Sequence, residues 1–143
     1  MALVELENVT KSYPQGAGLR TQERIVVDRV SLRVEAGETL GLVGESGSGK
    51  TTVARMILGL VQPTRGTVRV GGVDLARATA AQMKQVRREM QPVFQDPFAA
   101  LNPRMKVLEI VTEPWAIHGL EAGVGRGATR ARAVELLGQV GLE

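Results

Sequence analysis

Eight consecutive residues combine glycines, hydroxyls and one lysine at a spacing that suits phosphate binding. Residues 44–51 read GESGSGKT and fit the pattern G-x-x-x-x-G-K-[ST]. Gly47 and Gly49 permit positive φ angles and close backbone approach, so that successive N–H groups can form an anion-binding nest at the start of a helix. We expect Lys50 to reach the β- and γ-phosphates of a nucleotide and the Thr51 hydroxyl to hold Mg²⁺. The pattern therefore predicts a nucleotide site.

The whole loop is expected to contribute to that site, because its backbone N–H groups act together. The predicted phosphate contacts are Gly44, Glu45, Ser46, Gly47, Ser48, Gly49, Lys50, Thr51 and Thr52.

Such a loop needs a buried strand before it and a helix after it. Residues 39–43 form a short, mostly apolar run, which is typical of a buried parallel strand. After the loop, Val53, Met56, Ile57 and Leu60 are spaced to share one helical face. We expect that helix to end near Gly59, since Pro63 follows it.

The remaining early segments predict antiparallel strands. Residues 4–9 read as a strand that ends at Tyr13 and Pro14, and residues 25–34 read as a second strand. Residues 66–73 read as a hairpin with its turn at Gly71 and Gly72. These patterns indicate a β-rich N-terminal lobe around the nucleotide loop.

The later half is mainly helical. Thr79 and Gln82 form a capping box that starts a helix over 80–90. Residues 92–94 predict a short apolar strand, and a proline-bearing loop follows over 95–104. Two further helices are expected, one from Val107 that bends at Pro114 and one over 133–140. Strands mixed with helices place the chain in the α/β class.

Composition narrows the functional class. The chain has 143 residues, a net charge of +3, no cysteine and 43% hydrophobic residues, as in a soluble globular protein. No run is long enough to span a membrane, and the N-terminus lacks a signal pattern. The basic residues are scattered and no aromatic platform accompanies them, which argues against nucleic-acid binding. The absence of cysteine fits the cytosol.

Four segments outside the loop carry a family resemblance. They read NVTKSY at 8–13, GETLGLVG at 37–44, PTRG at 63–66 and VFQDP at 93–97, the last running on to LNPR at 101–104. Together they resemble the ATP-binding subunits of ABC transporters, in the branch that powers oligopeptide and dipeptide import. The implied fold is a RecA-like P-loop NTPase core with an antiparallel β lobe and the start of a helical subdomain, with the core and lobe over about 1–95 and the remainder over about 96–143.

The resemblance also implies roles for residues outside the loop. Tyr13 matches the aromatic residue that stacks on adenine, and Gln95 matches the glutamine that contacts Mg²⁺ and the attacking water. Lys50 and Gln95 are then the catalytic residues in this chain, and ATP and Mg²⁺ are the cofactors. The implied partners are transmembrane permease subunits and a second ATP-binding subunit, at the cytoplasmic face of the cell membrane. His118, the one histidine, does not match the family's switch histidine.

In the family, the LSGGQ signature, the acidic strand and the switch histidine lie downstream of the glutamine, and none occurs in these 143 residues. We therefore expect a truncated N-terminal portion of the domain, which binds Mg·ATP but hydrolyses little of it alone. An alternative is a catalytically incomplete fragment that binds only nucleotide or a partner. A different P-loop enzyme, such as a small-molecule kinase or a GTPase, is a third possibility, although no N-K-x-D motif supports a GTPase.

Overall fold

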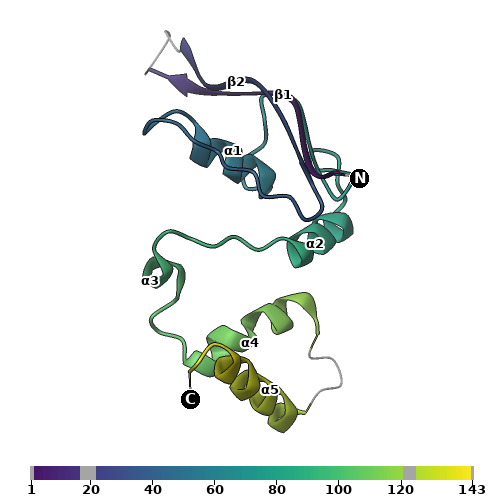
Figure 1. Ribbon diagram of the computed structural model, residues 1–143, viewed down its shortest axis with the longest axis vertical. Coiled ribbons are helices and arrows are strands. Elements are labelled where there is room, and N and C mark those ends of the chain that lie inside the picture. Colours follow the sequence, from purple (N-terminus) through teal and green to yellow (C-terminus); the bar gives the residue numbers. More distant parts are fainter. Residues whose placement is uncertain (1, 17–21, 121–124, 143) are drawn as a thin grey trace. The chain divides into compact units, whose positions relative to one another are not determined.

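The chain forms two compact units in the computed structural model, which describes residues 2–16, 22–120 and 125–142 (Figure 1). The first unit spans Met1–Gln91 and the second spans Pro92–Glu143. The first unit holds the sheet and the nucleotide loop, whereas Gln95 belongs to the second. The boundary expected near residue 95, between the nucleotide-binding core and the helical subdomain, stays a prediction.

One antiparallel sheet forms the frame of the first unit. Its strands are β1 (Ala2–Gln15), β2 (Gln22–Glu35), β3 (Arg65–Val70) and β4 (Val73–Asp74). Their spatial order is β2-β1-β3-β4. Gly71 and Gly72 have φ angles of 55° and 79° and make the turn between β3 and β4, because glycine adopts positive φ readily. The predicted antiparallel lobe and hairpin are confirmed.

Strand β1 is longer than the sequence suggested. It continues through Tyr13 and Pro14, which were expected to end it, and pairs with β2 as far as Gln15. Its pairing with β3 extends only to Thr10. Beyond that point one side of β1 has no ladder hydrogen bonds to lose, so a proline is tolerated there.

The register of the β1–β2 ladder shifts at four places, and two of these are bulges at residues with positive φ angles. Asn8 and Arg29 adopt positive φ angles of 48° and 46°, which are uncommon for residues other than glycine. The diverted N–H of Asn8 donates to Ser31 Oγ at 2.9 Å, and that of Arg29 donates to Thr10 Oγ1 at 3.1 Å. Hydroxyls on the partner strand thus replace the ladder bonds that the bulges remove.

The core lies between the sheet and helix α1 (Lys50–Ile57), which runs along one face of β1 and β2 (Figure 1). Val53 and Met56 of α1 are buried, as their helical spacing predicted. Leu60 lies beyond the end of α1 and is exposed. The buried apolar side chains of this core are Leu6, Val9, Val27, Val53, Met56, Val68, Leu75 and Val86.

Helix α2 (Ala80–Glu89) begins at the predicted capping box. The Gln82 N–H donates to Thr79 Oγ1 at 3.3 Å, and the Thr79 N–H donates to Gln82 Oε1 at 2.9 Å. Val86 is buried in the core of the first unit. The reciprocal cap thus fixes the start of the helix that carries this contact.

Two predicted strands are wrong. Residues 39–43 are irregular, and Leu40, Leu42 and Val43 are exposed, Val43 by 94%. Residues 92–94 are also irregular. An apolar run becomes a strand only when a neighbouring strand accepts its backbone hydrogen bonds. Neither run is paired within the parts of the chain that the structure describes.

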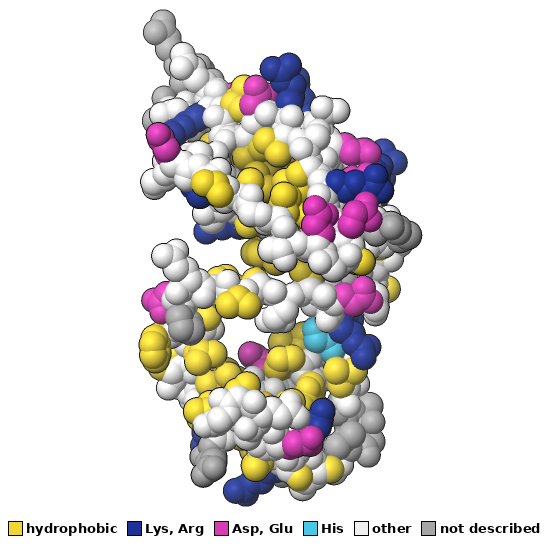
Figure 2. Space-filling model, in the orientation of Figure 1, with side chains coloured by type: hydrophobic (Ala, Val, Ile, Leu, Met, Phe, Trp, Pro, Cys, Tyr) yellow, Lys and Arg dark blue, Asp and Glu magenta, His cyan; other side chains and the backbone are white. Residues whose placement is uncertain are grey.

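The second unit contains α3 (Pro97–Ala100), α4 (Val107–His118) and α5 (Arg126–Gln139). Helix α4 starts with a Glu109 carboxylate that accepts the Lys106 N–H at 2.8 Å, and it runs through Pro114. Ala133 of α5 is buried. Figure 2 shows apolar side chains on the surface of this unit, and the most exposed of them are Val93 at 95% and Phe98 at 87%.

Candidate nucleotide site

The loop over 44–49 leads directly into the N-terminus of α1. Gly49 is the N-cap residue, with a φ angle of 95°, and no side chain caps the helix among the residues that the structure describes. The first backbone N–H groups of a helix have no intrahelical partner, and a glycine cap cannot supply one. These donors and the positive end of the helix dipole therefore favour an anion at this position.

A cavity of about 190 Å³ lies at the start of the helix. It is lined by Val26, Gly47, Gly49, Lys50, Thr51 and Thr52. Five of these six residues belong to the predicted phosphate loop, so the structure brings them together around one hollow. Val26 comes from β2 and was not predicted from the sequence.

Two glycines of the loop face close neighbours. A Cβ added to Gly49 would lie 2.7 Å from the carbonyl oxygen of Val26 and 3.2 Å from Val27 Cγ2. A Cβ on Gly44 would lie 2.8 Å from Ser48 Oγ. At position 49 a side chain is disfavoured both by the positive φ angle and by the nearby backbone of β2. At position 44 a Cβ would approach only the small side chain of Ser48. Strand β2 therefore sets the position of the loop.

Lys50 folds back over the loop. Its Nζ donates to the carbonyl oxygens of Gly44 at 2.7 Å and Glu45 at 2.6 Å, and to Ser48 Oγ at 3.3 Å. No carboxylate pairs with Lys50 anywhere in the described ranges. The ammonium is thus oriented by neutral oxygens, and no carboxylate of the described residues competes with a phosphate for it.

Thr51 and Thr52 place two hydroxyl side chains at the cavity. Mg²⁺ takes oxygen ligands and usually keeps several waters, so it needs only one or two protein ligands beside phosphate oxygens. The described residues contain no group of three acidic, histidine or cysteine side chains that could hold a metal on its own. A hydroxyl beside a phosphate cradle fits Mg²⁺ bound together with a nucleotide.

Tyr13 lies on the strand that pairs with the wall of the cavity. It is opposite Arg24 of β2, two residues from Val26, and it is 38% exposed. Lys11 Nζ lies 5.0 Å from the centroid of its ring. An exposed aromatic ring and the phosphate cavity are therefore both positioned by one short stretch of β2.

Gln95 is exposed and lies in the irregular segment before α3. The Asp96 carboxylate that follows it accepts the Phe98 N–H at 3.0 Å and so begins α3. A role for Gln95 at the nucleotide loop stays a prediction.

Solved structures share this fold. The chain superimposes on the ATP-binding cassette MJ0796, described as a dimer in a post-hydrolysis state bound to ADP and Pi, with a TM-score of 0.77 and 30% identity over 98% of this chain and 58% of that one. The family model for ABC transporters matches residues 27–143. The chain belongs to the ABC transporter family.

Similar relatives within the ABC transporter family are named as ATP-binding proteins of peptide transport. The chain is 44% identical, over 99% of its length, to the "Probable peptide ABC transporter ATP-binding protein y4tS" of Sinorhizobium fredii. It is 40% identical, over 98% of its length, to the "Oligopeptide transport ATP-binding protein OppD" of Mycobacterium bovis. It spans 40% of the first relative and 23% of the second. Within the described ranges, none of its helices combines the length and apolar character needed to cross a bilayer.

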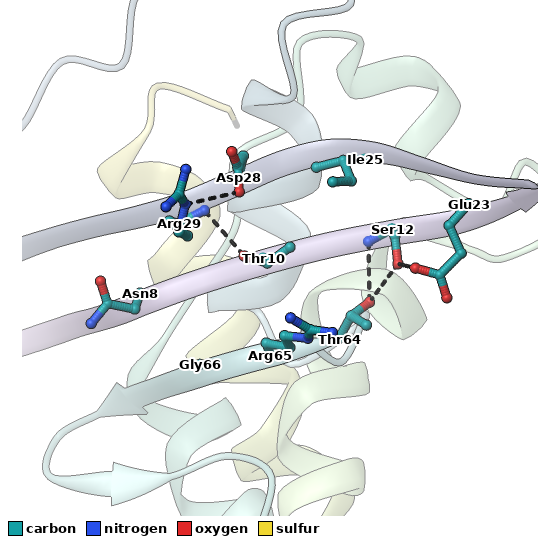
Figure 3. A pocket seen from close by; sticks show the side chains of 10 residues that line it. All are labelled: Asn8, Thr10, Ser12, Glu23, Ile25, Asp28, Arg29, Thr64, Arg65 and Gly66. Atoms are coloured by element: carbon teal, nitrogen blue, oxygen red, sulfur yellow. Dashed lines mark hydrogen bonds and ion pairs between the residues drawn. The ribbon is translucent and has the colours of Figure 1, made fainter.

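This ABC transporter chain also has a larger polar groove, of about 530 Å³, across β1, β2 and the start of β3 (Figure 3). Its polar groups already bond to one another: Ser12 Oγ donates to Glu23 at 3.1 Å, and the Ser12 N–H donates to Thr64 Oγ1 at 3.1 Å. No helix N-terminus or phosphate-loop residue lines it. We therefore assign phosphate binding to the smaller cavity. The polar residues at alternate positions 8, 10 and 12 of β1 are a sequence signal for the groove.

Proposed function

We propose that this chain binds Mg·ATP through residues 44–52 and is the nucleotide-binding part of an ATPase that powers import of peptides or similar solutes. The observation that carries the proposal is the arrangement of Lys50, whose ammonium, among the residues that the structure describes, bonds only to loop oxygens beside an uncapped helix N-terminus. Donors held in place before the ligand arrives need little rearrangement to bind it.

Each predicted residue then has a distinct task. Lys50 and the backbone N–H groups bind the phosphates, and the Thr51 hydroxyl is the protein ligand for Mg²⁺. When bound there, Mg²⁺ would supply positive charge next to the phosphates. Tyr13 stacks on the base, an interaction worth about 1–3 kcal/mol that tolerates different bases. Gln95 is the residue proposed to orient the attacking water.

Isothermal titration with Mg·ATP tests the proposal. A charge-assisted hydrogen bond contributes about 1.5–3 kcal/mol, so Lys50→Ala is expected to raise the Kd by about 10- to 150-fold. Lys84→Ala on the exposed face of α2 changes a lysine outside the loop and is expected to leave the Kd unchanged. Equal affinities for the wild-type chain and Lys50→Ala would refute the assignment of the site.

The alternative function is binding without turnover. It is favoured by the lining of the loop cavity, which contains no carboxylate or amide side chain that could position a water, since hydrolysis requires a positioned water as well as bound phosphates. A phosphate-release assay beside the titration distinguishes the two functions. Steady release that Lys50→Ala abolishes would support an ATPase, whereas binding with no release would support a binding fragment.

The exposed apolar side chains of the second unit support docking to other subunits. Phe98, Val107 and Ile117 are 87%, 61% and 62% exposed, and exposed apolar side chains mark an interaction surface where they form a contiguous patch. We propose permease subunits and a second ATP-binding subunit as the partners, at the inner face of the cell membrane. The names of the relatives favour peptide cargo. Loss of labelled oligopeptide uptake, with sugar uptake retained, in a strain lacking the parent gene would support that cargo.

A further inference from the structure

Lys11 of β1 makes two contacts that fix its ammonium against Tyr13. Its Nζ donates to the carbonyl oxygen of Gln62 at 2.8 Å and lies 5.0 Å from the centroid of the Tyr13 ring. That separation is within the range of about 6 Å in which an ammonium is attracted to an aromatic face. One face of the ring is therefore covered by a cation that is itself anchored to the backbone.

The backbone around Lys11 is anchored as well. The Thr64 N–H donates to the carbonyl oxygen of Thr10 at 2.8 Å, and the Ser12 N–H donates to Thr64 Oγ1 at 3.1 Å. Figure 3 shows the Ser12 and Thr64 side chains meeting at the groove. These bonds tie β1, on both sides of Lys11, to the segment that supplies the Gln62 carbonyl.

Lys11 and Tyr13 project from the face of β1 that is opposite to the groove. Neighbouring side chains of a strand point to opposite faces, so residues 11 and 13 point away from the side that Ser12 occupies. Lys11 is paired with Val27, which is buried against the core that contains α1. The ammonium and the ring thus lie on the same side of the sheet as the phosphate loop.

We propose that Lys11 is a positioning residue for the base of the bound nucleotide, which holds the Tyr13 ring so that its uncovered face is presented for stacking. The inference rests on the proposed function, since it takes Tyr13 as the base platform. An exposed tyrosine loses rotamer freedom when a base stacks on it, and a contact that orders the ring beforehand reduces that loss. Lys11 acts on the base end of the nucleotide and not on its phosphates.

The test separates base binding from phosphate binding in the 143-residue chain. Lys11→Met removes the charge and keeps the length of the side chain, Lys11→Arg keeps a cation that can stack on the ring, and Lys84→Met is the matched control. Each variant is titrated with Mg·ATP and with magnesium tripolyphosphate, which has no base. The ¹³C–¹H resonances of the Tyr13 ring are recorded without ligand, and they are unambiguous because the chain has 1 tyrosine.

Lys11→Met is expected to raise the Kd for Mg·ATP by about two- to tenfold, which corresponds to ordering one side chain. It should leave the Kd for tripolyphosphate unchanged and shift the Tyr13 ring resonances, and Lys11→Arg should restore the ATP affinity. If Lys11→Met raised the Kd for both ligands equally, or changed neither the ring resonances nor the Kd for Mg·ATP, the inference would be overturned. The proposed function would still stand in that case, provided that Lys50→Ala binds Mg·ATP more weakly than the wild-type chain does. A wild-type chain that binds neither ligand would refute the proposed function and this inference together.

Discussion

Replacing Gly49 by alanine probes the contact between β2 and the phosphate loop. The new methyl group would lie 2.7 Å from a backbone oxygen of Val26 and 3.2 Å from Val27 Cγ2, at a φ angle of +95°. The backbone conformation costs about 1–3 kcal/mol for a residue other than glycine, and overpacking costs about 1–3 kcal/mol more. We therefore expect Gly49→Ala to lower the free energy of unfolding by about 2–6 kcal/mol.

Two other glycines provide matched controls for the two parts of that cost. Gly47 has a φ angle of +81° but no atom within 4 Å of an added Cβ, so Gly47→Ala bears the backbone strain alone, about 1–3 kcal/mol. Gly41 has neither a positive φ angle nor a close neighbour. Gly41→Ala is expected to be neutral or to stabilise by about 0.4–1 kcal/mol, because it restricts the unfolded chain.

Urea unfolding followed by far-ultraviolet circular dichroism measures this series. With a slope of about 1–3 kcal/mol per molar, Gly49→Ala should lower the urea midpoint by about 0.7 M or more, and by more than Gly47→Ala does. Equal midpoints for Gly49→Ala and Gly47→Ala would mean that the Val26 carbonyl does not constrain the loop. A midpoint for Gly49→Ala as high as that of Gly41→Ala would refute the strain argument as well.

Three further predictions concern the first unit. Met56→Ala should lower the free energy of unfolding by about 2–5 kcal/mol, measured by heat or urea, because Met56 is 1% exposed. Leu60→Ala, at a position that is 63% exposed, should lower it little. Thr79→Ala should cost about 0.5–2 kcal/mol because it removes the α2 capping box, and a loss of amide-exchange protection confined to the start of α2 would identify the cause. Arg69 on β3 contacts the carboxylates of Glu7 at 3.0 Å and Glu5 at 3.5 Å, and the hydrogen bond with Glu7 raises the pKa of Arg69. A raised arginine pKa contributes stability that is fully present below the pKa of the unfolded state and is lost only as pH rises through the pKa of the folded state. The difference in melting temperature between wild type and Arg69→Gln should therefore be constant from about pH 7 to pH 10. A difference that falls over this interval would contradict the argument.

Local chemistry made the phosphate loop and the turns predictable. The glycines and Lys50 of the loop, the Gly71–Gly72 turn and the Thr79–Gln82 capping box each require particular residue types at short spacing, and sequence displays that directly. The extent of β1 was not predictable in the same way, because Pro14 is tolerated only where β3 no longer pairs with β1.

Features that depend on distant partners were missed. Residues 39–43 and 92–94 have strand-like composition but no paired neighbour in the part of the chain that the structure describes. The contribution of Val26 comes through its backbone carbonyl, which no side-chain pattern reveals. The contact of Lys11 with Tyr13 depends on a carbonyl 51 residues further along the chain.

The double use of β2 limits where this chain can change in length. Arg24 is paired with Tyr13, and the carbonyl of Val26 lies against Gly49. The distance between the ring and the phosphate loop is therefore set by the two-residue separation of Arg24 and Val26 on β2. A residue inserted between them would reverse the faces of the side chains that follow and move one end of the nucleotide site relative to the other. An insertion at the bulge of Arg29, beyond Val26, would leave that count intact. Natural variation in length should therefore be tolerated at the bulge and selected against over residues 24–26.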